Sequence, residues 1–156
     1  MDSHLYPKWL LELLMENNLP WDEGLQIEPL EFAKHFSVHD SSLLKISMEP
    51  AWDCDTILSI QWDTYWNPKY YKYPGSSVMN WPFLMIRIEN CSKLEMENFR
   101  NIGGIQRSLA GFTVQRDTSY ISTFEDHYEA KVRIIHMGKF SVLLYDEFGR
   151  LQKLTI

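Results

Sequence analysis

Apolar residues near the start of the chain recur at helical spacing. Between residues 7 and 17 they fall on one stripe, formed by Trp9, Leu10, Leu13 and Leu14. Such a stripe is typical of an amphipathic helix. Pro7 suits the first helical turn, where its missing N–H costs nothing, and the Asn-Asn-Leu-Pro stretch from Asn17 is a stop signal. The pattern predicts a helix over residues 7–17.

A second, shorter helix is predicted over residues 29–36. Leu30, Phe32, Ala33 and Phe36 form a broad apolar face on a helical wheel. Residues 37–42 then have the composition of a loop.

From about residue 43 onward, the apolar residues form short runs of strand length, in several of which they alternate with polar ones. The predicted strands are 43–48, 57–62, 83–88, 112–116, 120–124, 129–136, 140–146 and 151–156. Residues 92–100 are predicted as a short helix, although Leu94 and Met96 also fit a loop.

Two glycine-containing segments of the last third are placed where hairpin turns are expected. They are Met137-Gly138 and residues 146–149, whose glycines can adopt the positive φ that tight hairpin turns need. Between them, Phe140, Val142 and Leu144 share one face of a strand. The opposite face is also partly apolar, so we expect this strand to be covered on both sides.

Two helices followed by successive strands predict an α+β fold. We expect two N-terminal helices packed on a curved antiparallel β-sheet or partial barrel. Residues 1–156 show no repeat and no linker, which indicates a single domain. A chain of this length can bury a substantial core without a disulfide or a metal.

Aromatic residues are unusually frequent, at 14% of the chain, and many gather between residues 62 and 82. Prolines and a glycine make this segment irregular, and irregular segments mostly run over the surface. Because Trp and Tyr dominate binding hot spots, we predict a partner-binding surface. Its aromatic members are Trp62, Tyr65, Trp66, Tyr70, Tyr71, Tyr73 and Trp81. Two alternatives are that the rings fold back and plug one end of the sheet, or that they line a small-ligand pocket.

The charge is unevenly distributed along the chain. The whole protein carries a formal net charge of −6, with −9 in residues 1–66 and +3 in residues 67–156. An acidic half argues against nucleic-acid binding, which needs cations for phosphates, and favours a basic partner. Asp53, Asp55 and Asp63 lie beside or within the aromatic segment and are predicted to extend the same surface. The alternative for residues 52–55 is a simple turn.

One group of residues has a spacing that could bind a metal. Glu31, His35 and His39 are spaced at i, i+4 and i+8, and imidazoles with a carboxylate can bind zinc. However, His39 is expected to lie past the end of the helix, so a solvated helix flank is favoured. We predict no metal site and no cofactor, and the chain lacks nucleotide-binding glycine motifs.

A second group has the residue types of a general base. Glu125, Asp126 and His127 are consecutive, with His136 downstream, and a carboxylate can orient a neighbouring imidazole. Neighbours on a strand point to opposite faces, so Asp126 and His127 need not touch. With no nucleophile motif in the sequence, no catalytic residue is predicted and a non-enzymatic protein is favoured.

The remaining features bear on location. Cys54 and Cys91 are too few for a disulfide framework. The N-terminus lacks the pattern of a signal peptide, and no apolar stretch is long enough for a membrane span. We therefore expect a cytoplasmic protein without a membrane partner.

These observations lead to a hypothesis and two alternatives. The hypothesis is an immunity or inhibitor protein that masks a basic partner such as a toxic nuclease, with the three aspartates mimicking phosphates and the aromatic rings as anchors. The first alternative is a small-ligand-binding protein or lyase-like enzyme, with an aromatic pocket in a cupped β-sheet and His127 or His136 as the working group. The second is a structural subunit that associates through its aromatic patch.

Overall fold

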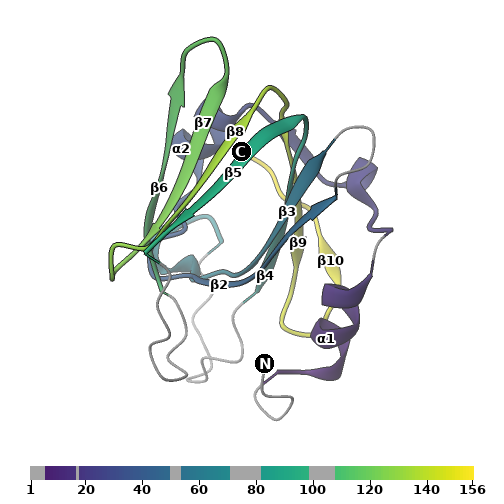
Figure 1. Cartoon of the computed structure of the whole chain (residues 1–156). Helices are drawn as coiled ribbons and strands as arrows, with labels where there is room; N and C mark the ends of the chain where they lie inside the picture. Colours follow the sequence, from purple (N-terminus) through teal and green to yellow (C-terminus); the bar gives the residue numbers. More distant parts are fainter. Residues whose placement is uncertain (1–5, 17, 50–53, 71–81, 99–107) are drawn as a thin grey trace.

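The computed structural model describes residues 6–16, 18–49, 54–70, 82–98 and 108–156 (Figure 1). Its helical elements are α1 (Lys8–Met15), α2 (Pro29–His35) and the short 3-10 turns η1 (Trp21–Glu23) and η2 (Thr64–Trp66). Its strands are β1 (Leu25–Ile27), β2 (Ser42–Glu49), β3 (Asp55–Gln61), β4 (Phe83–Ile88), β5 (Cys91–Glu97), β6 (Leu109–Arg116), β7 (Tyr120–Asp126), β8 (Lys131–His136), β9 (Phe140–Tyr145) and β10 (Leu151–Gln152). No described helix is long and apolar enough to cross a membrane.

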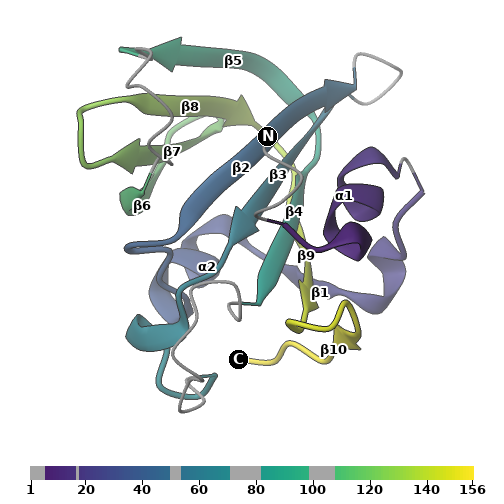
Figure 2. The same cartoon turned by 90° about the horizontal axis from the view of Figure 1, so that it is seen from below.

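The strands form two curved antiparallel sheets, which confirms the predicted α+β class. The larger sheet has the order β1-β9-β4-β3-β2, with β10 also paired to β9, and the smaller sheet has the order β5-β8-β7-β6. Figure 2 shows the larger sheet between α1 and the smaller sheet. Both sheets remain open rather than closing into a barrel.

Two long bent strands run through both sheets. β4 continues into β5, and β8 continues into β9, and the two bent strands pair with each other along their whole length. The pairing passes from Ile88 opposite Phe140 in the larger sheet to Cys91 opposite His136 in the smaller one. The sheets therefore share a corner, and the bend folds one sheet over the other.

The prediction of a hairpin turn at Met137-Gly138 is wrong, because this segment forms the corner instead. The Gly138 N–H donates to the Glu89 carbonyl (3.1 Å). A Cβ at position 138 would lie 2.6 Å from Glu89 Cβ and 2.7 Å from the Glu89 carbonyl oxygen. Glycine is needed here for the close approach of two backbones. At residues 146–149 the predicted hairpin is confirmed: Gly149 has φ +83° and the turn joins β9 to β10.

The predicted helix over residues 92–100 is also wrong, since β5 occupies Cys91–Glu97. The segment extends the bent strand and pairs with β8, and this pairing outweighs local preference. Leu94 and Met96, two residues apart, carry the strand period that the helix prediction overlooked. The sequence also missed β1, whose three residues are too few to show a period.

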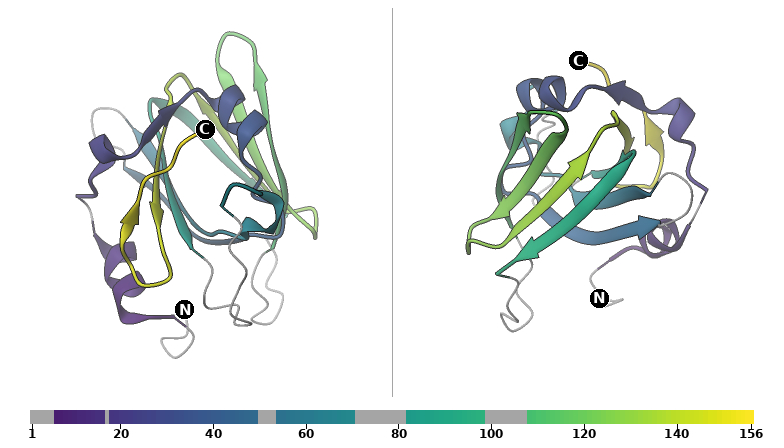
Figure 3. Two further views of the ribbon diagram at one scale, coloured as in Figure 1. Left: turned by 180° about the vertical axis from the view of Figure 1, so that it is seen from behind. Right: turned by 45° about the horizontal axis from the view of Figure 1, so that its top comes forward.

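The main core lies between the two sheets. Its largest fully buried members include Trp62, Phe32, Phe124 and Phe140. α2 covers one end of this core, where the Phe32 ring meets the rings of Phe112 (5.6 Å) and Phe140 (5.4 Å). Figure 3 shows α2 beside the end of the smaller sheet.

The outer face of the larger sheet carries a second layer of apolar packing. Leu10 and Leu14 of α1 are buried against Phe83, whereas Leu143 and Tyr145 of β9 pack against Trp21 of η1. Every residue of β9 is buried. This confirms the expectation that the strand is covered on both sides.

The corner generates a prediction about stability. Gly138→Ala should lower the free energy of unfolding by about 1–3 kcal/mol, because the new methyl group meets backbone that cannot move aside. Gly111→Ala is the matched control, since a Cβ there has no neighbour within 4 Å. Urea unfolding of both variants measures the difference. Equal midpoints for Gly138→Ala and the wild type would contradict this account of the corner.

Candidate functional site

Two residues of the predicted aromatic surface face inward: Trp62 belongs to the core, and the half-buried Tyr70 packs against it. The Trp62 side chain is fully buried, and its Nε1–H donates to the Ser37 carbonyl (2.8 Å). Tyr70 packs against Trp62 with ring centres 5.4 Å apart, and its hydroxyl donates to the Thr155 carbonyl (2.6 Å). For these two rings the structure follows the alternative in which the segment folds back against the end of the sheet.

Tyr65 and Trp66, by contrast, project from the surface. They lie on η2 and are 61% and 46% exposed. The Asp63 carboxylate accepts the backbone N–H of Tyr65 (2.9 Å) and so caps this short turn. The buried Asn67 side chain then fastens the turn, accepting the Ser37 N–H (2.8 Å) and donating to the Ser37 carbonyl (2.8 Å). Both exposed rings are therefore carried on a braced backbone.

Trp66 connects this turn to a pair of histidines. Its indole Nε1–H donates to Asp40 Oδ2 (3.2 Å), and its ring meets the His39 ring edge to face at 4.7 Å. The other carboxylate oxygen, Asp40 Oδ1, lies 3.1 Å from His127 Nε2 and 3.5 Å from His39 Nε2. We call Tyr65, Trp66, His39, Asp40 and His127 the aromatic–histidine cluster.

The two sheets also meet away from the corner, and this second contact brings His127 to the cluster. Ser42 at the start of β2 forms a bridge with Ser108. Around it, the Leu109 N–H donates to the Ser41 carbonyl (2.7 Å), and the His127 N–H donates to the Ser108 carbonyl (3.2 Å). Asp40 and His127 are thus neighbours in space although they lie 87 residues apart.

The Asp126 carboxylate binds the backbone of the turn that carries His127. One of its oxygens accepts the backbone N–H groups of Tyr128 and Ala130, each at 2.8 Å, so Asp126 stabilises the turn between β7 and β8. The carboxylate beside His127 belongs to Asp40, which sequence reasoning missed. No local pattern could have found it, because the contact depends on how the two sheets meet.

The spacing of Glu31, His35 and His39 does not bring the three side chains together. On α2, His35 Nε2 and Glu31 Oε2 are 3.2 Å apart and form a local hydrogen bond. The helix ends at His35, and His39 turns instead toward Asp40 and His127. Its Nδ1–H donates to the Ala110 carbonyl (2.7 Å).

The two described acidic residues of the predicted surface, Asp55 and Asp63, lie at opposite ends of β3. Asp55 begins this strand and Asp63 follows its end, a separation of roughly 25 Å at the usual rise of an extended chain. Asp55 lines a different hollow, together with Trp21 and Arg87. Of these two described aspartates, Asp63 is the one beside the exposed aromatic pair. Four other predicted members, Asp53, Tyr71, Tyr73 and Trp81, lie outside the described residues.

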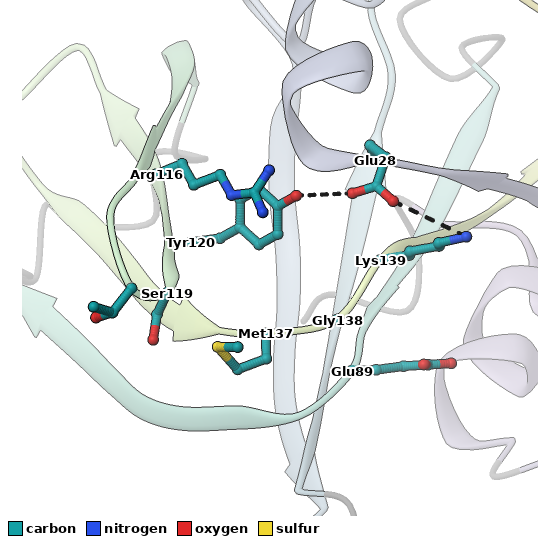
Figure 4. Close-up of a pocket in the computed structure, with 9 residues that line it drawn as sticks. Glu28, Glu89, Arg116, Ser119, Tyr120, Met137, Gly138 and Lys139 are labelled. Carbon is teal, nitrogen blue, oxygen red and sulfur yellow. Dashed lines mark hydrogen bonds and ion pairs between the residues drawn. The ribbon is translucent and has the colours of Figure 1, made fainter.

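A hollow of about 400 Å³ lies near the corner of the sheets (Figure 4). The Tyr120 hydroxyl donates to Glu28 (2.9 Å), which raises the pKa of Tyr120. Lys139 Nζ lies 4.0 Å from the same carboxylate, and the Arg116 guanidinium lies over the Tyr120 ring at 5.2 Å. Because Glu28 offsets the cations, this hollow is a poor match for an anionic ligand.

His136 is buried in the core and is not part of a surface site. Its Nδ1–H donates to the Gly138 carbonyl (3.1 Å), and the Ser122 hydroxyl lies 2.8 Å from Nε2. Burial lowers the pKa of His136, an effect partly opposed by the Gly138 carbonyl. The imidazole is therefore neutral, and its contact with Ser122 links the corner to β7.

The aromatic–histidine cluster is the described place where exposed aromatic rings, a carboxylate and imidazoles meet. It can present apolar faces to a protein, and it can offer nitrogen and oxygen lone pairs to a cation. No protein-family model, curated protein or solved structure matches the chain.

The buried His136 generates a prediction about pH. Between the ordinary pKa of 6.5 and the lower pKa of His136 in the folded protein, the unfolded chain binds a proton that the folded protein does not. The free energy of unfolding should therefore fall as pH drops from 7 toward 5, by up to about 1.4 kcal/mol per pH unit from this group.

The measurement is urea unfolding at pH 7 and pH 5. His136→Gln should lose this part of the pH dependence whatever its absolute stability, whereas His35→Gln, at an exposed position of α2, should retain it. An identical pH dependence in His136→Gln and the wild type would contradict the prediction.

Proposed function

We propose that this protein is a non-enzymatic binding protein, specifically an immunity or inhibitor protein that masks a basic partner such as a toxic nuclease. The observation that carries the proposal is the exposed pair Tyr65 and Trp66, held on a braced turn beside two carboxylates, Asp40 and Asp63. Adjacent exposed apolar side chains that form one patch, unlike rings exposed singly, often mark a binding site.

The geometry of the pair suits a binding anchor. Tyr and Trp bury large areas while losing little side-chain entropy. Here the cap from Asp63 and the indole hydrogen bond to Asp40 already order the turn, and the two rings meet edge to face at 5.1 Å. A partner would therefore spend little free energy on ordering this surface.

The charge of the chain supports a basic partner. Residues 1–66, which include Asp40, Asp63 and the aromatic pair, carry a net charge of −9. Such a charge accelerates the approach of a cationic protein and weakens with added salt. Carboxylates beside aromatic rings also suit Lys and Arg side chains, through ion pairs and cation–π contacts.

The proposal places the protein in the cytoplasm. Cys54 and Cys91 are free thiols, as is usual in a reducing compartment. An inhibitor of a nuclease would have to meet its target there to protect the cell's own nucleic acid.

Affinity capture from the native lysate tests this proposal. The wild-type protein should retain one basic protein at near-equal stoichiometry at low salt and less of it at high salt. With that partner purified, Tyr65→Ala and Trp66→Ala should each weaken binding by about 2 kcal/mol or more, roughly 30-fold, because each removes an anchor.

Phe148→Ala is the matched control, since Phe148 is equally aromatic and 67% exposed but lies on the turn between β9 and β10. It should bind as tightly as the wild type. Unchanged affinity in the Tyr65→Ala, Trp66→Ala double variant would refute the assignment of the surface, and capture of no basic partner at either salt would refute the function.

A further inference from the structure

We propose that His39, Asp40 and His127 bind a zinc ion, with His39 Nε2, Asp40 Oδ1 and His127 Nε2 as its ligands. This inference rests on the coordination geometry of the three side chains and does not depend on the proposed partner. It concerns residues that come from two distant parts of the chain and meet where the two sheets are joined.

The distances already match those of a zinc site. Asp40 Oδ1 lies 3.5 Å from His39 Nε2 and 3.1 Å from His127 Nε2. Ligands bound tetrahedrally at 2.0–2.1 Å are separated by about 3.3 Å from one another. The three ligand atoms lie within 4.8 Å of one another, so a small inward movement of one imidazole completes the face of a tetrahedron.

The hydrogen bonds around the ligands direct their lone pairs toward the ion. Because a carbonyl oxygen only accepts, the bond from His39 Nδ1 to the Ala110 carbonyl (2.7 Å) places a proton on Nδ1, so Nε2 is the nitrogen that can bind the ion. On the other side, the Trp66 indole donates to Asp40 Oδ2 (3.2 Å) and leaves Oδ1 for the ion. Such outer partners orient the ligands in known zinc sites.

Both imidazoles converge on one carboxylate oxygen. His127 Nε2 lies 3.1 Å and His39 Nε2 lies 3.5 Å from Asp40 Oδ1, and the two imidazole rings meet edge to face with their centres 5.4 Å apart. A single cation between the three ligand atoms would replace these contacts with three metal–ligand bonds.

The backbone fixes the ligands in place. Asp40 adopts a left-handed conformation, with φ +63°, and its N–H donates to the Leu109 carbonyl (2.8 Å). The His127 backbone is bound to Ser108 on the adjoining segment. A metal here would cross-link the two sheets at their junction and would thereby stabilise the fold.

The ligand set selects the metal. Two imidazoles and one carboxylate suit zinc and similar transition metals, whereas magnesium and calcium prefer oxygen ligands. The three side chains are about 40% exposed, so an ion and a competing chelator can both reach the site. The fourth position is open to water.

Zinc titration of the untagged protein against a chromophoric chelator tests the proposal. The wild type should bind one equivalent, with a melting temperature raised by about 5–10 °C at a hundredfold excess over the dissociation constant. His39→Ala, His127→Ala and Asp40→Asn should each weaken binding by about 10–100-fold or more. Asp40→Asn is informative because asparagine tolerates the left-handed backbone that this position adopts.

Two control variants show whether the zinc binds through these three side chains. His35→Ala removes the histidine of the Glu31–His35 pair on α2 and should leave zinc affinity unchanged. Tyr65→Ala removes an aromatic anchor without touching a ligand, and it should also bind zinc as the wild type does, so a failure of the partner proposal and a failure of the zinc proposal are distinguishable.

Cobalt provides a second readout, since Co²⁺ in a tetrahedral site absorbs strongly in the visible range. This absorption should appear with the wild type and with His35→Ala, and it should be lost in folded His39→Ala and Asp40→Asn. The proposal is overturned if the wild type binds zinc no more tightly than a His39→Ala, His127→Ala double variant, or if His35→Ala is the variant that loses the metal.

Discussion

The corner shared by the two sheets is the constraint on which the rest of the structure depends. Two long strands bend together there, and the Gly138 N–H bonds the Glu89 carbonyl across the bend. The backbones approach so closely that position 138 has no room for a side chain. Without this bend the two apolar faces could not enclose one core, in which the rings of Phe124 and Phe140 are buried. The neutral imidazole of His136 lies just inside the bend and completes its polar contacts.

The candidate site also forms because one sheet folds over the other. Because the smaller sheet turns back across the larger one, Ser108 reaches the beginning of β2 and forms a bridge with Ser42. This junction brings the turn that carries His127 against Asp40 and His39. The aromatic–histidine cluster therefore lies where two ends of the folded sheet are fastened together, and a ligand bound there would act on the stability of that junction as well as on recognition.

The aromatic segment has both buried and exposed rings. Trp62 and Tyr70 complete the core and the end of the sheet, whereas Tyr65 and Trp66 remain in water on η2. Sequence reasoning grouped them because they share a composition and a short stretch of chain. Which ring is buried depends on the path of the backbone after β3. That path includes the turn capped by Asp63, which the structure shows and the sequence pattern does not.

The sequence by itself determined the two helices, most of the strands and the α+β class, because apolar spacing records which faces are buried. It also determined that β9 is covered on both sides. Only the tertiary structure decided that Met137-Gly138 is a corner and that residues 91–97 form a strand, since both depend on pairing with distant partners. The same reason applies to the candidate site: His39 and His127 are visible in the sequence, but their meeting at Asp40 arises from contacts between segments 87 residues apart, which local patterns do not encode.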